Sequence, residues 1–238
     1  MRSTQAGIKS FVHLIKRGAR GMEIVRDADD REHFIDSLFI LNDEYQNPNW
    51  NRELAEVPRL TRPHHWPEAR PLVDIHAWTL LDNHLHMLIQ VRDDQAQGLS
   101  EFAQRLFRSM TGHFNEKYAE RGSIFQGPYR MSIVDSDEYL RYVIPYIIFK
   151  NVLDVRAGGT STAARDFEAA WDWAASYPYS SFRTHIGMWE PGSHILAAPS
   201  IVMELFPSEK RLKHACSDML LAHLEKRGEF HELQLEEW

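Results

Sequence analysis

The sequence has little cysteine and no long hydrophobic run. Cys216 is the one cysteine among 238 residues, which excludes an internal disulfide and a cysteine-based zinc cage. Apolar stretches such as residues 143–149 are far shorter than the roughly 20 residues of a membrane-spanning helix. The first residues show no secretory signal pattern. We therefore expect a cytoplasmic protein whose metal sites, if any, use histidine, carboxylate or amide ligands.

Positive charge is also in short supply. Lys and Arg number 27 against 34 Asp and Glu, so the formal net charge is −7 and indiscriminate binding of polyanions is disfavoured. A nucleic-acid surface would have to be local, and residues 100–130 form the only mildly basic candidate. We predict that phosphates could be contacted by Arg105, Arg108, Lys117 and Arg130. The alternative is that this helix simply needs a solvated face.

The first third of the chain predicts a strand, a helix and a long loop. Residues 8–17 are typical of a strand. Asp29 or Asp30 can cap the helix that follows, whose apolar residues recur at helical spacing through Leu41. Residues 46–71 contain five prolines and little periodicity, so we expect an inserted irregular loop there.

The middle of the chain predicts a hairpin and two helices. Two β-rich runs within residues 72–91 are separated by Asp82-Asn83, which favours a tight turn. An amphipathic helix covers residues 99–110, and a strand at residues 131–134 precedes a helix from residue 136 towards 151, for which Asp135 is a plausible start.

These elements predict an α+β fold with a central antiparallel sheet and helices on one face. We expect one domain over residues 1–157, with the loop 46–71 inserted in it. A glycine-rich break near residue 158 separates it from residues 158–238, which we expect to form a mostly helical C-terminal appendage packed on the core, with a last helix beginning at Ser208.

Two histidines are the first candidates for chemistry. His84 and His86 lie two residues apart in the second arm of the hairpin, so both imidazoles project from one face of the strand. Such a pair can hold a cation. Two surface histidines in a half-buried strand are the alternative, and by itself the pair does not decide between them.

The helix after residue 136 carries a hydroxyl-bearing face. At 100° per residue, Tyr139, Tyr142, Tyr146 and Lys150 fall close together, beside the apolar stripe that docks. Pro145 interrupts this helix, so we expect a kink or restart there. The tyrosines could merely pack with their hydroxyls at the surface. Together with a histidine-bound cation, however, a helical tyrosine is what phosphodiester cleavage through a covalent phosphotyrosine requires.

Several motifs in chain order resemble one family, the REP-associated tyrosine transposases of the HUH (His-hydrophobic-His) superfamily of single-strand DNA endonucleases. The matching segments are Lys16-Arg17-Gly18-Ala19-Arg20-Gly21, Asn83-His84-Leu85-His86, Phe114-Asn115-Glu116-Lys117-Tyr118, Gly122-Ser123-Ile124-Phe125-Gln126-Gly127, Asp137-Glu138-Tyr139-Leu140 and Tyr177-Pro178-Tyr179-Ser180-Ser181-Phe182. The resemblance implies a ferredoxin-like HUH fold and a Mg²⁺ or Mn²⁺ ion at His84 and His86. It also implies a single-stranded or hairpin DNA substrate, and Tyr146 as nucleophile with Tyr142 as the reserve candidate.

The sequence departs from the family pattern after the tyrosine. Proteins of this family usually carry Asn or Gln one helical turn later, where it completes the metal shell, whereas this chain has Lys150. Asn151 comes next, but on an unbroken α-helix it points about 140° away from Tyr146. We expect Asn151 to bind the metal only if a kink at Pro145 or a bulge turns it back, and Lys150 otherwise to contact the phosphate.

The remaining histidines and Trp66 have plainer interpretations. His64 and His65 are expected in a solvated loop, and Trp66 either stacks on a base or packs on the domain. Structural or exposed roles are expected for His13, His33, His113, His185 and His194.

Three functions remain open at this stage. The first is a metal-dependent, site-specific single-strand DNA endonuclease and strand transferase. The second is a related protein that binds structured DNA without cutting it, and the third is a phosphodiesterase that activates water. No membrane contact is expected, and the resemblance allows both monomers and a homodimer.

Overall fold

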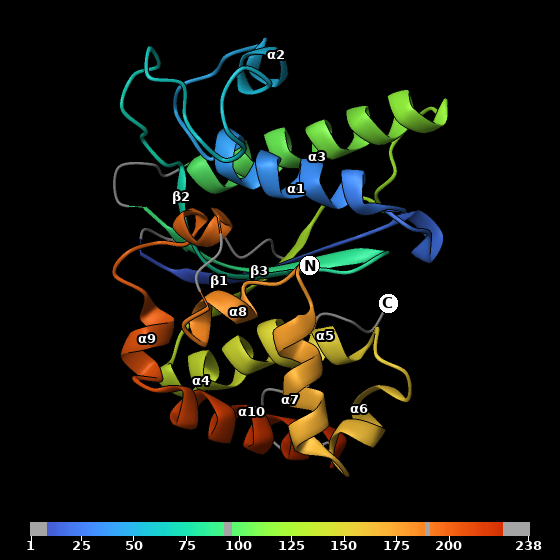
Figure 1. The fold of residues 1–238 in the computed structure, drawn as a ribbon, viewed down its shortest axis with the longest axis vertical. Coiled ribbons are helices and arrows are strands. Elements are labelled where there is room, and N and C mark those ends of the chain that lie inside the picture. Colours follow the sequence, from blue (N-terminus) through green and yellow to red (C-terminus); the bar gives the residue numbers. More distant parts are fainter. Residues whose placement is uncertain (1–8, 93–96, 189–190, 226–238) are drawn as a thin grey trace.

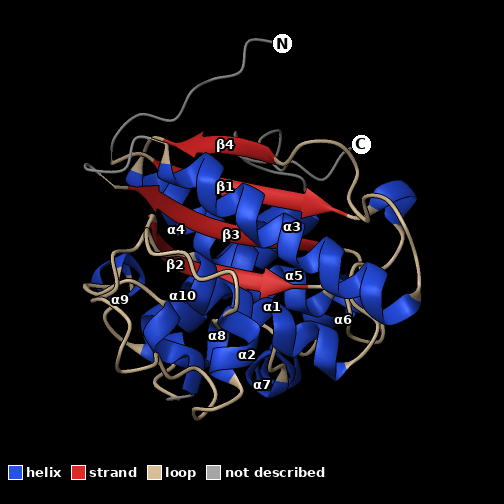
Figure 2. Cartoon of the chain, turned by 90° about the horizontal axis from the view of Figure 1, so that it is seen from above, coloured by secondary structure: helices blue, strands red, loops and turns tan. Residues whose placement is uncertain are grey.

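A computed structural model describes residues 9–92, 97–188 and 191–225, and a four-stranded sheet runs through its middle (Figure 1). The strands are β1 (Phe11–Arg17), β2 (Val73–Leu80), β3 (His84–Val91) and β4 (Arg130–Val134). They lie in the order β2-β3-β1-β4, and every neighbouring pair is antiparallel (Figure 2). The predicted α+β class with a central antiparallel sheet is confirmed.

Two long helices cover one face of the sheet. α1 (Ala28–Leu41) connects β1 to β2, and α3 (Gly98–Tyr118) connects β3 to β4, which gives the ferredoxin-like βαββαβ order. Phe34 of α1 and Phe102 of α3 are fully buried in a core that also includes Leu14 and Met87 of the central strands. The apolar spacing through Leu41 did predict this sheet-facing side of α1.

The opposite face of the sheet is covered as well, because β3 buries side chains on both of its faces. Met87 on one side and Leu88 on the other are both completely buried. The sequence predicted helices on one face of the sheet, whereas in the structure helices cover both faces. The second layer consists of α4 (Asp137–Pro145), the π-helical segment η2 (Tyr146–Lys150), α5 (Asn151–Leu153), α6 (Gly159–Ala163), α7 (Phe167–Ser176), α8 (Phe182–His185), α9 (Ile201–Leu205) and α10 (Glu209–Leu224).

A segment of the C-terminal part lies along the edge strand β2. The amide of Leu80 donates to the carbonyl of Tyr179 at 2.9 Å, and the amide of Ser181 donates to Trp78 at 2.9 Å. Thr79 and Ser180 form an antiparallel bridge. This segment therefore satisfies backbone groups that an edge strand would expose.

Local details differ from the sequence prediction at the element ends. Asp27 caps α1, not Asp29 or Asp30, because its side chain accepts the amide of Asp30 in a capping box. Ser136 caps α4 in place of Asp135. The proline-rich loop contains the short helix α2 (Trp50–Leu54), and single 3₁₀ turns occur at η1 (Ala19–Gly21) and η3 (Pro191–Ile195).

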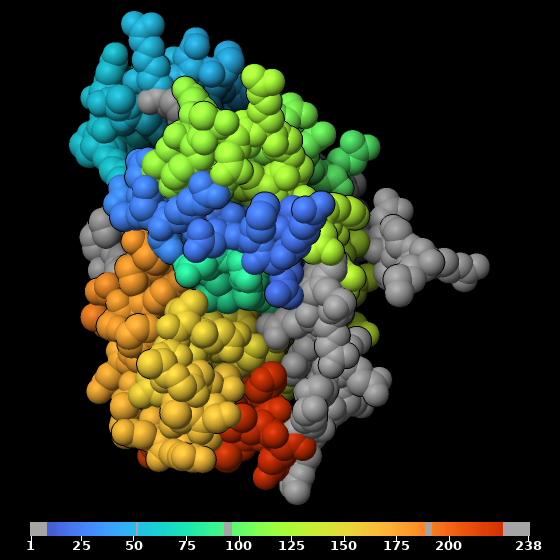
Figure 3. Space-filling view, turned by 90° about the vertical axis from the view of Figure 1, so that its right-hand side faces the viewer, coloured from blue at the N-terminus to red at the C-terminus, as the bar shows by residue number. Residues whose placement is uncertain are grey.

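The face drawn in Figure 3 displays the same layering from the side, with α1 and α3 above and the C-terminal helices below a narrow band of strand surface. Residue 8 of the expected first strand and residues 226–238 of the expected C-terminal part lie outside the described ranges. Within those ranges, no helix combines the length and the hydropathy of a membrane span.

Candidate tyrosine and cation site

A tyrosine and two imidazoles meet beneath the centre of the sheet. The ring centroid of Tyr146 lies 6.1 Å from that of His86 and 6.2 Å from that of His13. His84 lies beside His86, with ring centroids 5.1 Å apart. The structure thus brings the predicted nucleophile to His86, beside which His84 lies, and it adds His13, for which a structural or exposed role was expected.

Strand geometry explains how His13 reaches this cluster. In the β1–β3 pair, Ile15 lies opposite His86 and His13 lies opposite Leu88, so His13 and His86 are diagonal neighbours on one face. Their ring planes are inclined by 25° with centroids 5.2 Å apart, and His13 Nε2 is 3.0 Å from His86 Nδ1. Both side chains are buried.

The environment of His86 favours its neutral form. Burial, followed by the neighbouring His84, His13 and Lys150, holds the pKa of His86 well below the usual value for histidine. A neutral imidazole is the form that binds a metal ion. Burial therefore contributes most to keeping His86 in the neutral form that can coordinate a cation.

His84 is oriented by its chain neighbour. Its Nδ1 is 2.6 Å from Asn83 Oδ1, while Asn83 Nδ2 donates to the carbonyl of Gly21 at 3.3 Å. Because the amide nitrogen of Asn83 is turned towards Gly21, its oxygen faces His84 and accepts the Nδ1 proton. His84 then carries its lone pair on Nε2.

Lys150 lies against the candidate nucleophile. Its ammonium nitrogen is 4.9 Å from the ring centroid of Tyr146 and 3.0 Å from Asp154 Oδ2, and the side chain is buried. The only cationic group on this helix turn is thus held beside the tyrosine by a carboxylate. It is placed to compensate negative charge that arrives near the phenol.

Pro145 does not break the helix, and the residues after it form a π turn. The amide of Asn151 donates to the carbonyl of Tyr146, which is the i→i+5 bond of a π-helix. This bond places residue i+5 nearly above residue i, whereas an α-helix would turn Asn151 away. The bulge that the sequence analysis required for Asn151 is therefore present.

The amide of Asn151 is a candidate metal ligand in this region. The side chain is completely buried, and neither Oδ1 nor Nδ2 has a hydrogen-bond partner within the described part of the chain. Buried amides are almost always satisfied. An amide oxygen and two imidazole nitrogens form a donor set that fits a divalent cation, and imidazole favours Mn²⁺ over the more oxygen-selective Mg²⁺.

Side chains from outside the helix stabilise the π turn. Thr79 Oγ1 donates to the carbonyl of Ile147 at 2.6 Å, and Ser180 Oγ donates to the carbonyl of Ile148 at 3.4 Å. Both hydroxyls thus bond carbonyls of the segment in which the helical hydrogen bonding widens to i→i+5. The Ser-Ser element of the C-terminal part thereby supports the geometry at Tyr146.

Two arginines flank the site on the same face of the sheet. Arg130 lies opposite Ile15, which in turn lies opposite His86, and Arg17 lies opposite His84. Cross-strand partners share a face, so these side chains start from the site's side of the sheet. Arg130 was predicted from the sequence as a DNA contact, and Arg17 was not.

The other three predicted DNA contacts lie elsewhere. Arg105, Arg108 and Lys117 belong to α3, which covers the opposite face of the sheet from Tyr146. Arg105 bonds Glu101 and the carbonyl of Asp43. The structure does not bring these residues to the tyrosine.

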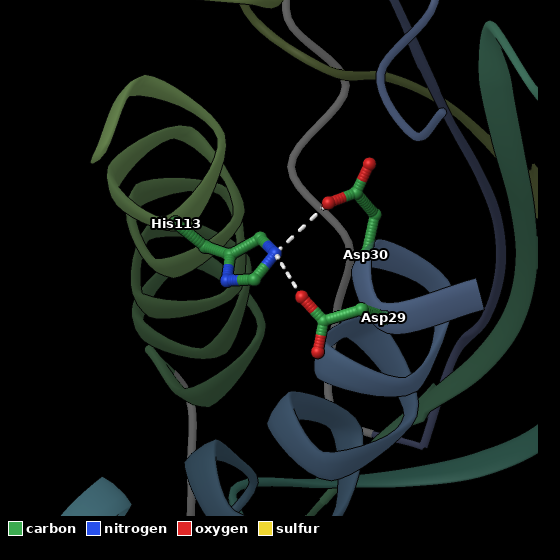
Figure 4. Close-up of side chains that lie close together, drawn as sticks. All are labelled: Asp29, Asp30 and His113. Carbon is green, nitrogen blue, oxygen red and sulfur yellow. Dashed lines mark hydrogen bonds and ion pairs between the residues drawn. The ribbon is translucent and has the colours of Figure 1, made fainter. Parts of the chain in front are cut away.

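Lys117 belongs to an acidic cluster between α1 and α3. In Figure 4, one ring nitrogen of His113 faces the carboxylates of Asp29 and Asp30, and one ligand atom from each residue lies within 4.8 Å of the others. Lys117 Nζ pairs with Asp29 and Asp30, at 2.9 Å each, and with Asp27 at 2.7 Å. An internal ammonium thus already neutralises the oxygens that a cation would use.

The pKa values in this cluster follow from its contacts. Burial would raise the pKa of Asp30, but hydrogen bonds from the Arg26 amide, Lys117, Tyr118 and His113 outweigh it and hold the pKa well below its ordinary value. Burial and the bond to Asp30 raise the pKa of Tyr118 to about 12. These shifts are those of a structural ion-pair network.

The residues of the proline-rich loop pack on the domain. Trp66 is buried, contacts Tyr45 with ring centroids 5.4 Å apart, and donates its indole N–H to Glu53 at 2.6 Å. His65 bonds the same carboxylate at 3.0 Å, and His64 is exposed. Of the two interpretations of Trp66, packing is the one that its contacts match.

The site is closed in this structure. Tyr146 is 1% exposed and Lys150 4%, and α10 packs on α4 and on the π turn. His223 of α10 lies edge-on to Tyr146, with ring centroids 5.9 Å apart. α10 is thus one of the elements that cover the tyrosine.

Sequence reasoning missed His13, Arg17 and Thr79 at this site. Each lies in a segment that was predicted as a strand. For His13 and Thr79, a polar residue buried within an apolar run was the available signal, whereas Arg17 ends its strand after Lys16 and is only partly buried. The pairing register that joins these residues to His84 or His86 is a long-range property.

Comparison with known proteins gives limited information. No protein-family model matches the chain, and no curated protein matches it. Among solved structures it is similar to one described as the REP-associated tyrosine transposase bound to a REP hairpin, with 12% sequence identity and a TM-score of 0.44. The similarity covers 81% of this chain and 88% of the other. A likeness at this level assigns no activity, so the interpretation of the site depends on its own geometry.

Proposed function

We propose that this protein is a metal-dependent single-strand DNA endonuclease and strand transferase that acts through a covalent phosphotyrosine. The observation that carries the proposal is the proximity of the Tyr146 ring to that of His86, with ring centroids 6.1 Å apart. Asn151, whose buried amide has no partner within the described residues, follows Tyr146 at the end of the same π turn. The sequence resemblance to HUH tyrosine transposases points to the same chemistry.

The residues have distinct roles in this proposal. His84, His86 and Asn151 would hold a Mn²⁺ or Mg²⁺ ion, which when bound supplies Lewis-acid polarisation of the scissile phosphate. The Tyr146 oxygen forms a bond to phosphorus and the bond from phosphorus to the leaving deoxyribose oxygen breaks. The phenol gives up its proton to water, and the leaving oxygen takes up one in turn, so that the products are a phosphotyrosine and a free hydroxyl. Lys150 offsets negative charge beside the phenol, and Arg17 and Arg130 are placed to contact flanking phosphates.

The substrate that we propose is single-stranded or hairpin DNA. With a net charge of −7, the protein must rely on local contacts, and the arginines beside the histidine pair provide them on the side of the sheet that carries the tyrosine. Arg105, Arg108 and Lys117 would then contact DNA only if it wraps to the other face.

A covalent adduct tests this function directly. The protein is incubated with end-labelled hairpin DNA and Mn²⁺, and adducts that survive SDS are counted on a denaturing gel. Tyr142→Phe is a matched control, because its ring stacks on that of Tyr146 at a centroid distance of 6.0 Å. We expect the parent and Tyr142→Phe to form the adduct and Tyr146→Phe to form none.

Equal adduct in Tyr146→Phe and the parent would contradict the assignment of the nucleophile.

The closed site favours a second candidate, a protein that binds structured DNA without cutting it, since Tyr146 is almost inaccessible here. Hairpin binding with no adduct in any divalent metal is its signature. If Tyr146→Phe retains DNA hydrolysis while His84→Ala loses it, water is the nucleophile.

A further inference from the structure

The two histidines of the site each have a hydrogen bond at Nδ1. For His84 the partner is Asn83 Oδ1, an acceptor, so the proton belongs to His84 Nδ1. For His86 the partner is Nε2 of another imidazole, His13, at 3.0 Å. In that pair the proton can belong to either ring.

The position of this proton decides whether His86 can bind a cation. If His86 Nδ1 carries it, His86 Nε2 has the lone pair that a metal ion needs. If His13 Nε2 carries it, His86 accepts at Nδ1, and a neutral His86 must then be protonated at Nε2, the nitrogen on the other side of its ring. The neighbour of His86 therefore determines which edge of His86 is a ligand.

We infer that His13 is a positioning residue that accepts the Nδ1 proton of His86 and so keeps the lone pair of His86 on Nε2. The inference rests on the cation site of the proposed function. Metal-binding histidines usually donate their other ring N–H to an acceptor that fixes their tautomer and orientation. Asn83 does this for His84, and His13 is the corresponding group for His86.

The location of His13 is suited to this role. It projects from β1, a central strand with neighbours on both sides, and its ring plane is inclined by only 25° to that of His86. Its ring also lies edge-on to Tyr146. An acceptor held this rigidly restricts the rotation of the His86 ring and keeps its Nε2 edge aimed in one direction.

Two substitutions separate positioning from packing. His13→Phe retains an aromatic ring but has no acceptor, and His13→Gln loses the ring but can place a carbonyl oxygen near the Nε2 position. Binding of Mn²⁺ to each full-length protein is measured by calorimetry. We expect a loss of affinity of about 10- to 100-fold in His13→Phe and a value within a few-fold of the parent in His13→Gln.

A second readout needs no metal. Nitrogen NMR of ¹⁵N-histidine-labelled protein reports the tautomer of His86, which we expect to be Nδ1–H in the parent and in His13→Gln, and mixed or reversed in His13→Phe. Unchanged Mn²⁺ affinity or an unchanged tautomer in His13→Phe would overturn the inference. A parent that binds no Mn²⁺ would contradict the cation site itself, and the tautomer measurement would still decide the role of His13.

Discussion

At the residue scale, Asn151 illustrates a conflict between stability and ligand binding. Leaving a buried amide without partners costs about 1–3 kcal/mol. Nothing in the described part of the chain compensates Asn151, so its amide stabilises the protein only when a ligand occupies the site.

We predict that Asn151→Leu raises the free energy of unfolding of the metal-free protein by about 1 kcal/mol, because an unsatisfied amide is replaced by an apolar group of similar size. Urea unfolding measures this change, and Mn²⁺ affinity should fall in the same variant. The control is Asn42→Leu, which should destabilise, since Asn42 bonds both the amide and the carbonyl of Val73. A loss of stability in Asn151→Leu would show that the amide is already satisfied.

His33 predicts a pH dependence of stability. Burial, and next the charge of nearby His113, lower the pKa of His33 to about 4. The unfolded chain takes up a proton near the ordinary histidine pKa of about 6.5, whereas the folded protein does so only near 4. His33 therefore contributes stability above about pH 6.5 that is lost as the pH falls towards 4.

The measurement is urea unfolding at several pH values between 7.5 and 4. We expect His33→Gln to weaken the decline of unfolding free energy over this range, while the exposed His64→Gln leaves it as in the parent. Identical pH slopes for parent and His33→Gln would contradict the assignment.

At the scale of elements, the π turn depends on donors from other segments. Thr79 Oγ1 reaches the carbonyl of Ile147, and Thr79 is completely buried. We predict that Thr79→Val, which keeps the shape but removes the donor, lowers the free energy of unfolding by about 1–3 kcal/mol. Urea unfolding checks the loss, with exposed Thr61→Val as the control. An unchanged stability would mean that the π turn needs no donor from β2.

Elements with strong local patterns could be predicted, and the π turn could not. Two β-rich runs on either side of Asp82-Asn83 predict the hairpin. The helical spacing of apolar residues through Leu41 predicts the buried side of α1. Pro145 predicts an interruption of the helix, but the sequence does not show whether the helix kinks or widens into a π turn. The hydroxyls that bond the carbonyls of the π turn come from Thr79 and Ser180, which are distant in sequence.

At the scale of the whole molecule, the sheet separates two chemical environments. The α1–α3 side carries the ion-pair network around Lys117, and the other side carries Tyr146 and the histidines. The sequence shows the positive charge along α3, and this charge predicted a phosphate-binding face. The sequence does not show that the packing of α1 against α3 pairs Lys117 with acidic residues at the start of α1.

Cys216 offers a probe of how the second layer opens. It is the only cysteine, it lies in α10, it is fully buried, and burial raises the pKa of its thiol. We predict slow reaction with a thiol reagent in the free protein, and faster reaction when hairpin DNA is bound, because α10 covers Tyr146 and a strand that reaches the tyrosine from that side displaces it. The measurement is the labelling rate with and without DNA.

The control carries Cys216→Ser together with Leu221→Cys, which places a thiol at a half-exposed position of the same helix. Its labelling should be fast in both conditions. If DNA binds but the labelling rate of Cys216 stays the same, the substrate enters without displacing α10.

The widened turn at Tyr146 also bears on how related chains should be recognised. A search that demands an amide four places after a tyrosine passes over this protein, because one additional residue lies within the turn and the amide is five places away. The π turn brings the residue five places on towards the side of the tyrosine, the direction that an α-helix gives to the residue four places on. A pattern that pairs a tyrosine with an amide on one helix should therefore tolerate one inserted residue.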